Sequence, residues 1–141
     1  MSPRLFVSRL FFGVKPALLK GLTARVTRIE LTDAGVVVNL NRYGQAAMGV
    51  TSGALESVKL TNGVLQAYWR SPPGTVFNTA GLRRKLKGSC MCRVVKPTTI
   101  LLLSADDFEA ELSVNRPLSE ALDARDESTG HPKIDFGRPA E

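Results

Sequence analysis

Residues 82–97 read LRRKLKGSCMCRVVKP, and this stretch decides the fold that the sequence predicts. Short runs of strand-compatible residues lie on both sides of the tripeptide Lys87-Gly88-Ser89. Because glycine adopts a positive φ that other residues resist, the tripeptide is typical of a tight turn between two strands. Pro97 lacks a backbone donor, so we expect the second strand to end there. A lysine at the tip of such a turn favours an anionic partner, and RNA is the first candidate.

The composition is that of one domain with tails. A chain of 141 residues is long enough to bury one hydrophobic core but not two independent ones. The formal net charge of +6 favours a polyanionic partner, with nucleic acid ahead of an anionic membrane surface. No run approaches the roughly 20 apolar residues that span a bilayer, so no membrane insertion is expected.

Residue types that carry catalytic or metal chemistry are few. Cys90 and Cys92 would face the same side of a strand, but no second Cys or His pair is present to complete a zinc site. We interpret the cysteines as small residues of a reduced interior. The one histidine, His131, lies in a tail with Gly and Pro and offers no catalytic dyad or triad. We therefore expect a protein that is not an enzyme and has no cofactor and no metal.

The N-terminus has two interpretations that both stay open. Apolar residues recur at helical spacing from Leu5 to Leu22, and Pro16 is placed to start a second short helix over residues 17–20. Residues 1–12 are amphipathic and contain arginine but no acid, a pattern that fits a docking helix and also a mitochondrial transit peptide.

Period-two alternation indicates strands in the middle of the chain. Residues 22–31 alternate, a turn follows at 33–35, and residues 36–40 form the next β run, which together predict a hairpin. Residues 54–61 alternate again, and the turn dipeptide Asn62-Gly63 separates them from a further run over 64–70.

The stretch around Lys87-Gly88-Ser89 resembles the second signature of the Sm/LSm family, in which Arg-Gly-Asn or Arg-Gly-Ser is followed by alternating apolar residues and a proline. Met91 and Pro97 follow that spacing, with lysine in place of arginine. Residues 29–35 resemble the opening hairpin of the family, and residues 54–61 resemble the third strand of D-type Sm proteins. The family's first signature, Asp-x-x-Met-Asn, survives only at Met48.

The resemblance implies a mostly β fold, a strongly bent five-stranded open barrel with an N-terminal helix. Residues 1–21 would form the N-terminal arm and helix, and residues 22–103 the barrel. Residues 104–141 would be a C-terminal extension that is partly helical or disordered.

The resemblance also implies a function. Sm-type subunits form a heteromeric, heptameric ring that holds a uridine-rich single-stranded site of a small nuclear RNA in the spliceosomal core, which places the protein in pre-mRNA splicing in the nucleus, with assembly in the cytoplasm. The degraded first signature suggests a variant subunit specific to one particle, and residues 62–81 would contact a particle-specific protein. The expected RNA-binding residues are Tyr43, Met48, Gly49, Lys87, Gly88 and Ser89. The expected contacts with other Sm subunits are Leu82, Leu86, Met91, Arg93 and Val95.

Alternatives remain at several points. Gly49 stands at the family's asparagine, so Tyr43 or Arg42 would have to supply a ring or a cation instead, while Tyr43 equally fits a core or interface aromatic. An LSm-type ring subunit of the U6 or messenger-decay kind is the second interpretation of the whole chain. A basic structural subunit of a mitochondrial ribosome or similar assembly is the third, motivated by residues 1–12.

Overall fold

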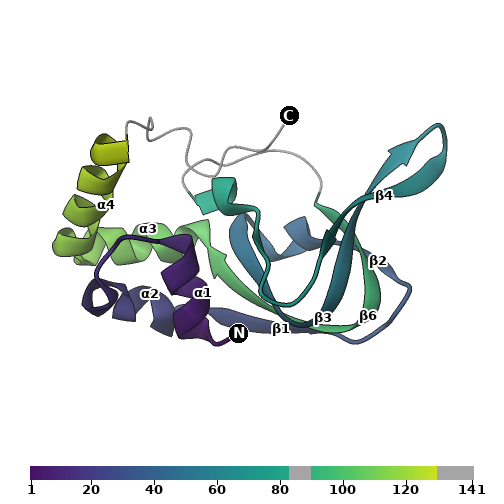
Figure 1. Ribbon diagram of the computed structural model, residues 1–141, viewed down its shortest axis with the longest axis horizontal. Helices are drawn as coiled ribbons and strands as arrows, with labels where there is room; N and C mark the ends of the chain where they lie inside the picture. Colours follow the sequence, from purple (N-terminus) through teal and green to yellow (C-terminus); the bar gives the residue numbers. More distant parts are fainter. Residues whose placement is uncertain (83–89, 130–141) are drawn as a thin grey trace.

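Two long antiparallel strands organise the computed structural model, which describes residues 1–82 and 90–129 (Figure 1). The other strands pair beside them, and the helices gather at one end of the resulting sandwich. In chain order the elements are α1 (Pro3–Leu10), η1 (Pro16–Leu19), α2 (Lys20–Ala24), β1 (Thr27–Leu31), β2 (Val37–Asn39), η2 (Leu40–Tyr43), β3 (Ala46–Thr61), β4 (Val64–Ser71), β5 (Val76–Phe77), η3 (Thr79–Leu82), β6 (Met91–Ser104), α3 (Ala105–Val114) and α4 (Arg116–Thr129).

The long strands β3 and β6 pair from Ala46 opposite Ser104 to Ser57 opposite Cys92. The other side of β6 pairs first with β2 and then with β1. The other side of β3 pairs with β5 near its start and with β4 along its second half. All of these pairs are antiparallel. Together the strands form a sandwich of the jelly-roll kind with flanking helices.

The β3–β6 ladder is interrupted near its middle, where the register shifts between Val50 and Leu55. Gly53 has φ +87° at this point, and a Cβ there would overlap the carbonyl oxygen of Pro97 and the side chain of Thr98. The Thr98 hydroxyl accepts a hydrogen bond from the Ala54 amide (3.1 Å). Glycine is required because the backbone is left-handed and because β6 approaches it closely.

The long strands contribute to two hydrophobic cores. The sandwich core lies between the strands and the helical core lies between the strand ends and the helices. The buried residues of the sandwich core are Leu31, Leu40, Ala46, Met48, Val50, Leu55, Cys92, Val94, Ile100 and Leu102. Those of the helical core are Phe6, Val7, Leu10, Phe11, Leu19, Leu22, Ala47, Leu82, Leu101, Leu103, Phe108, Leu118 and Leu122.

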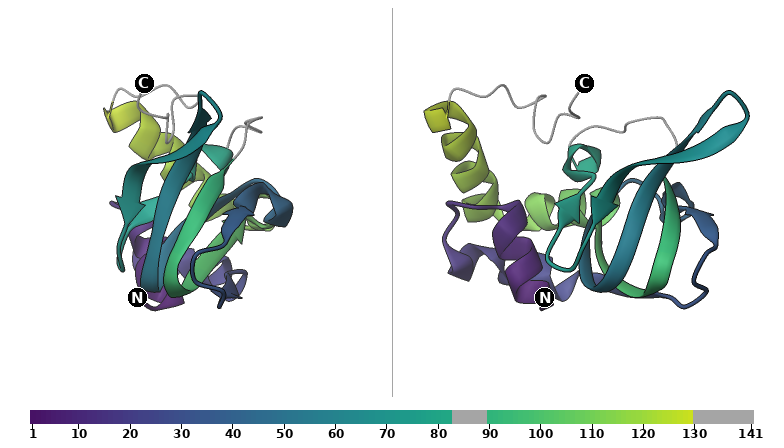
Figure 2. Two further views of the ribbon diagram at one scale, coloured as in Figure 1. Left: turned by 90° about the vertical axis from the view of Figure 1, so that its right-hand side faces the viewer. Right: turned by 45° about the vertical axis from the view of Figure 1, so that its right-hand side comes forward.

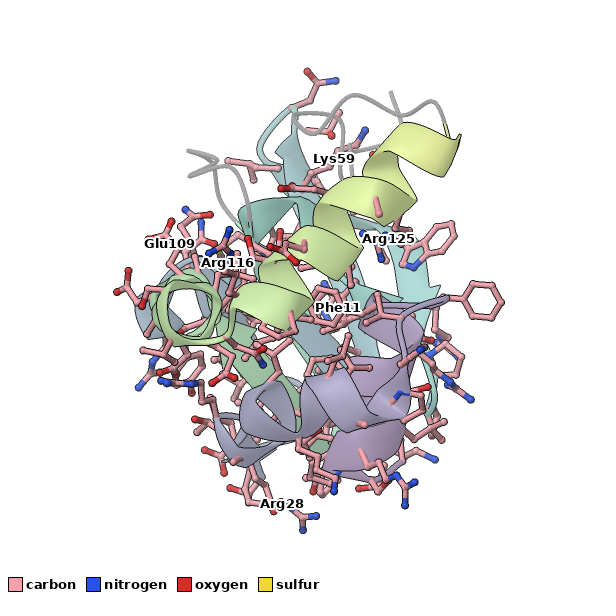
Figure 3. All side chains as sticks on the ribbon, turned by 90° about the vertical axis from the view of Figure 1, so that its left-hand side faces the viewer. Phe11, Arg28, Lys59, Glu109, Arg116 and Arg125 are labelled. Atoms are coloured by element: carbon pink, nitrogen blue, oxygen red, sulfur yellow. The ribbon has the colours of Figure 1, made fainter. Side chains whose placement is uncertain are left out.

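Helices from both ends of the chain meet in the helical core. Phe11, labelled in Figure 3, follows the last residue of α1. Its ring stacks on that of Phe108 in α3 with centroids 5.4 Å apart. Arg25, just after α2, donates through Nε to the buried carboxylate of Glu111 in α3 at 3.1 Å. Gly21 makes room for this carboxylate, because a Cβ at that position would overlap it. N-terminal and C-terminal helices therefore form one packed layer.

The Sm-like five-stranded open barrel is wrong. The expected hairpin over residues 22–40 does not form, because β1 and β2 each pair with β6 and not with one another. The strand expected over 22–31 begins only at Thr27, after α2. The hairpin is wrong because alternation indicates a strand but does not say which strand it pairs with.

Pro97 does not end β6, which continues to Ser104. The register shift leaves Pro97 without a ladder partner, so its missing N–H costs no hydrogen bond there. Of the fourth strand expected over 82–86, Leu82 belongs to η3 and the rest lies outside the described residues. The strands expected on both sides of Asn62-Gly63 are confirmed as β3 and β4.

We expect Gly53→Ala to destabilise the fold by at least about 2 kcal/mol, because it combines a left-handed backbone with overlap on β6. Gly63→Ala is the matched control, since Gly63 also has a positive φ (+78°) but a Cβ there would meet no atom within 4 Å. It should cost only about 1 kcal/mol. Urea unfolding of the two variants measures the difference, and equal losses would contradict the close-approach argument.

Candidate functional site

Three polar side chains gather inside the sandwich where β6 begins. Ser57 of β3 lies opposite Cys92, and Cys90 precedes Cys92 by two residues. Leu55, Cys92 and Val94 belong to the sandwich core, so this face of the strands points inward. Cys92 is buried while Ser57 and Cys90 are half-buried. We call this end of the interior, defined by Ser57, Cys90 and Cys92, the sandwich mouth.

The two thiols of the mouth have different acidities. A hydrogen bond from Cys92 lowers the pKa of Cys90 below its ordinary value, and burial opposes this effect in part. The pKa of Cys92 is raised, first by its hydrogen bond to Cys90 and then by burial. Cys90 is therefore the more readily ionised thiol, and it is also the more accessible one.

A charged cluster occupies the opposite face of the same strands. The carboxylate of Glu56 accepts a hydrogen bond from Arg70 of β4 at 3.0 Å and lies 3.6 Å from a nitrogen of Arg93 in β6. One carboxylate thus faces two guanidinium groups, which leaves a net positive charge at the end of the sandwich that carries the mouth. Both arginine side chains keep part of their surface in solvent.

The short helix η3 is placed by specific contacts. Asn78, which precedes it, has φ +60° and donates through Nδ2 to the carbonyl oxygen of Ala46 at 2.8 Å. Leu82, at the end of η3, is 1% exposed in the helical core. Cys90 packs against the sandwich core, and its carbonyl accepts from the Leu40 amide at 2.9 Å. The chain between Leu82 and Cys90, which contains Arg83, Arg84, Lys85 and Lys87, thus begins at one core and ends at the other.

Two hollows lie elsewhere. A groove of about 470 Å³ between α1 and the η1–α2 segment is lined by Arg4, Pro16, Ala17, Leu19, Lys20 and Thr23. A smaller hollow of about 220 Å³ lies beside the β1–β2 connection, where the Arg42 guanidinium stands 5.2 Å from the centre of the Tyr43 ring. Most side chains of the larger groove are exposed, so it is an open surface and not an enclosed site.

The residues expected to bind RNA are scattered. Tyr43 lies in η2 and packs against the sandwich core, while Met48 is fully buried in that core. Gly49 is buried in β3, with Phe6 and Met1 against it. The expected residues Lys87, Gly88 and Ser89 lie outside the described part of the chain.

The residues expected to form subunit contacts either lie in the core, lie in the paired strand β6, or fall outside the described residues. Leu82 belongs to the helical core, and Leu86 is not among the described residues. Met91, Arg93 and Val95 lie in β6. Arg93 has Val37 on one side and Glu56 on the other, so β6 offers no free edge there for a neighbouring subunit.

Comparisons with known proteins agree on one fold. No protein-family model and no curated protein sequence matches the chain. The sensor domain of the transcriptional regulator DNR from Pseudomonas aeruginosa is similar with a TM-score of 0.61 and 21% identity over 98% of this chain and 95% of that one. A cyclic nucleotide-binding domain from Methylobacillus flagellatus gives 0.63 and 16% identity over 89% of this chain and 79% of that one.

The regulatory domain of Toxoplasma gondii PKA, crystallised with cAMP, has a TM-score of 0.66 and 17% identity over 96% of this chain. This chain spans about half of that one (52%). At these identities the likeness establishes the fold, which is the antiparallel sandwich with flanking helices of cyclic nucleotide-binding domains.

These structures correct the interpretation based on residues 82–97. The similar structures are cyclic nucleotide-binding domains and not Sm or LSm proteins, so the splicing function, the ring partners and the small nuclear RNA expected from that resemblance are wrong. A basic tripeptide before a run of strand-compatible residues is a short local pattern, and it does not by itself specify a fold. The nuclear location stays a prediction.

Sequence reasoning did not find the mouth or the charged cluster as sites. It placed Cys90 and Cys92 on one side of a strand but had no means to bring Ser57 beside them. Glu56, Arg70 and Arg93 come from three strands, and their contact depends on strand pairing that the sequence does not state. The one local signal was the Cys-x-Cys spacing itself.

We expect iodoacetamide to modify Cys90 well before Cys92, with a half-maximal rate at a pH below the ordinary thiol value. Cys92→Ala removes the hydrogen-bond donor and should shift this midpoint to higher pH, whereas Cys92→Ser keeps a donor and should shift it less. Mass spectrometry of the alkylated peptides at several pH values measures the midpoints. Faster modification of Cys92 in the native protein would contradict the assignment.

Proposed function

We propose that the chain is a non-catalytic regulatory domain that senses a small anionic ligand, and that this ligand is a cyclic nucleotide. The observation that carries the proposal is the match to a sensor domain along almost the whole of both chains, helices included. The nature of the ligand is supported by the similar regulatory domains from Toxoplasma gondii PKA and PfPKA-R, both described with cAMP.

The sandwich mouth is the place we propose for the ligand. A cyclic nucleotide combines a phosphate that needs cations with hydroxyl and ring atoms that need hydrogen bonds, and its base needs apolar contact. Ser57, Cys90 and Cys92 supply polar atoms beside the apolar sandwich core. Four basic residues occur in the sequence between Leu82 and Cys90, and Arg70 and Arg93, on the opposite face of the same strands, add positive charge to this end of the sandwich.

The packing of η3 supports a regulatory role. Leu82 contacts the helical core at one end of the basic stretch, and Cys90 contacts the sandwich core at the other. Leu82 and Cys90 are eight residues apart in the sequence, so a ligand that displaces Cys90 would also act on Leu82 and the helical core. The Phe11–Phe108 stack and the Arg25–Glu111 pair would pass a displacement to helices of both chain ends.

A binding role fits the chemistry of the mouth better than catalysis. The mouth holds one hydroxyl and two thiols, and the carboxylate of Glu56 lies on the other face of the strands, occupied by two arginines. A nucleophile of this kind would need a general base within hydrogen-bond reach. We therefore propose that the response to the ligand is conformational.

Titration calorimetry of the purified chain with cAMP and cGMP, with 5′-AMP as the acyclic control, tests the proposal. We expect one cyclic nucleotide to bind per chain, with 5′-AMP at least about tenfold weaker because its dianionic, open phosphate fits a different geometry. At a ligand concentration of about 100 times Kd, binding should stabilise the fold by about 2.7 kcal/mol, which raises the melting temperature by several degrees. A folded chain that binds neither cyclic nucleotide would contradict the choice of ligand.

A matched pair of variants on β3 tests the location. Ser57→Ala removes a hydroxyl from the mouth and should weaken binding by about tenfold, the worth of one hydrogen bond. Ser52→Ala removes an exposed hydroxyl on the same strand and should leave binding unchanged. If Ser57→Ala has no effect while Lys20→Glu, in the groove between α1 and α2, abolishes binding, the ligand occupies that groove and not the mouth.

A further inference from the structure

The last part of β3 and all of β4 form a two-stranded ribbon that extends away from the sandwich (Figures 1 and 2). Beyond Ser57, β3 has β4 as its partner among the described strands, and β4 pairs with β3 alone among them. Residues 64–70 of β4 are all exposed. The outer edge of β4 therefore presents backbone N–H and C=O groups that no described strand satisfies.

The ribbon carries large apolar side chains in solvent. The exposed fractions are 69% for Leu60, 60% for Val64, 40% for Leu65, 60% for Tyr68 and 61% for Trp69. Edge strands are commonly protected from pairing by lysine or proline, and β4 contains neither. Tryptophan and tyrosine at such a place are the residue types enriched in binding hot spots.

The aromatic side chains lie on one face of the ribbon. The register between β3 and β4 shifts so that Ser57 pairs with Trp69 and Val58 pairs with Ala67, which makes Tyr68 the extra residue of a β-bulge. The Lys59 ammonium lies 5.5 Å from the centre of the Tyr68 ring. Lys59 and Ser57 are two apart on β3 and share a face, so Tyr68 and Trp69 lie on this face too, together with Val64 opposite Thr61.

The residues along β4 match a second copy of the same strand. An antiparallel pair of β4 strands around a two-fold axis at Gln66 sets Val64 of each copy opposite Tyr68 of the other. Both residues lie on the aromatic face, so the Val64 side chain of each copy contacts the Tyr68 ring of the other. The two Gln66 side chains meet at the axis, and a primary amide both donates to and accepts from another amide.

The charges fit this arrangement as well. In this register the two Arg70 residues lie about eight residues apart along the strand direction, or about 26 Å, well beyond the screening length of about 8 Å at physiological salt. Each Arg70 also keeps its own Glu56 partner. A parallel pair would place equal charges side by side, so the antiparallel order is favoured.

We propose that β4 is the docking edge for a second copy of this chain, which pairs through its own β4 in antiparallel order about Gln66. The interface is isologous, because the same strand serves both copies, and it extends each sheet across the two-fold axis. It sets the aromatic faces of the two ribbons side by side and satisfies the free edge of β4.

Sedimentation equilibrium of the full chain from about 1 to about 500 µM tests the pairing. We expect a monomer–dimer equilibrium. Trp69 is the only tryptophan of the sequence, so its emission should shift to shorter wavelength as dimer forms. Val64→Glu and Tyr68→Lys should each weaken the dimer by about 30-fold, and Val114→Glu, at an exposed residue of α3, should not.

A mixture of the two weakened variants tests the register. The introduced carboxylate and the introduced ammonium face one another at one contact of the mixed dimer, while the second contact keeps the native Val64–Tyr68 pair. Dimer formation in the mixture should therefore exceed that of either variant alone. Circular dichroism of each variant confirms that it is folded.

The proposal is overturned by any of four results. These are a monomer at every concentration, a dimer that both ribbon substitutions leave unchanged, a mixture no stronger than the separate variants, and a Trp69 shift that phosphatidylcholine–phosphatidylserine vesicles cause in a protein that stays monomeric. The last result would show that the ribbon meets a membrane surface instead.

Discussion

The pairing of β3 with β6 is the constraint on which the rest of the structure depends. Every other strand hydrogen-bonds to one of these two, and both hydrophobic cores take residues from them. Alternate residues of the two strands face different cores: Ala46, Met48, Ile100 and Leu102 belong to the sandwich core, and Ala47, Leu101 and Leu103 belong to the helical core. The left-handed Gly53 and the Thr98 hydroxyl interrupt the ladder midway, and beyond them Leu55, Cys92 and Val94 continue the sandwich core.

The residues on either side of the basic stretch lie against different cores. The sandwich core ends at Ser57, Cys90 and Cys92, where the apolar interior gives way to polar atoms, and Arg70 and Arg93 lie on the opposite face of the same strands. The helical core holds Leu82, which is separated from Cys90 by the most basic stretch of the chain.

The sequence predicted local structure better than pairing. Asn62-Gly63 between two alternating runs identified the β3–β4 hairpin, since the turn chemistry and both strands are adjacent in the chain. The helical spacing from Leu5 onward likewise identified α1. The sequence predicts the strand from Met91 but wrongly ends it at Pro97, because the register shift that leaves Pro97 without a partner depends on β3 and β1. The hairpin predicted over 22–40 and the ring edge predicted at Arg93 are wrong for the same reason, since strand pairing is non-local.

The central ladder also has a consequence for how the chain reaches this state. The β3–β4 hairpin joins neighbouring residues and can close early, whereas β3 must wait for β6, which lies far along the chain. Strands that lie far apart in the sequence pair slowly, because the chain between them must lose conformational entropy before their contacts form. During synthesis on the ribosome, the apolar run Ala46–Val50 would stay uncovered until residues up to Ser104 have emerged. Nascent chains of this protein are therefore natural clients for chaperones that hold exposed apolar segments.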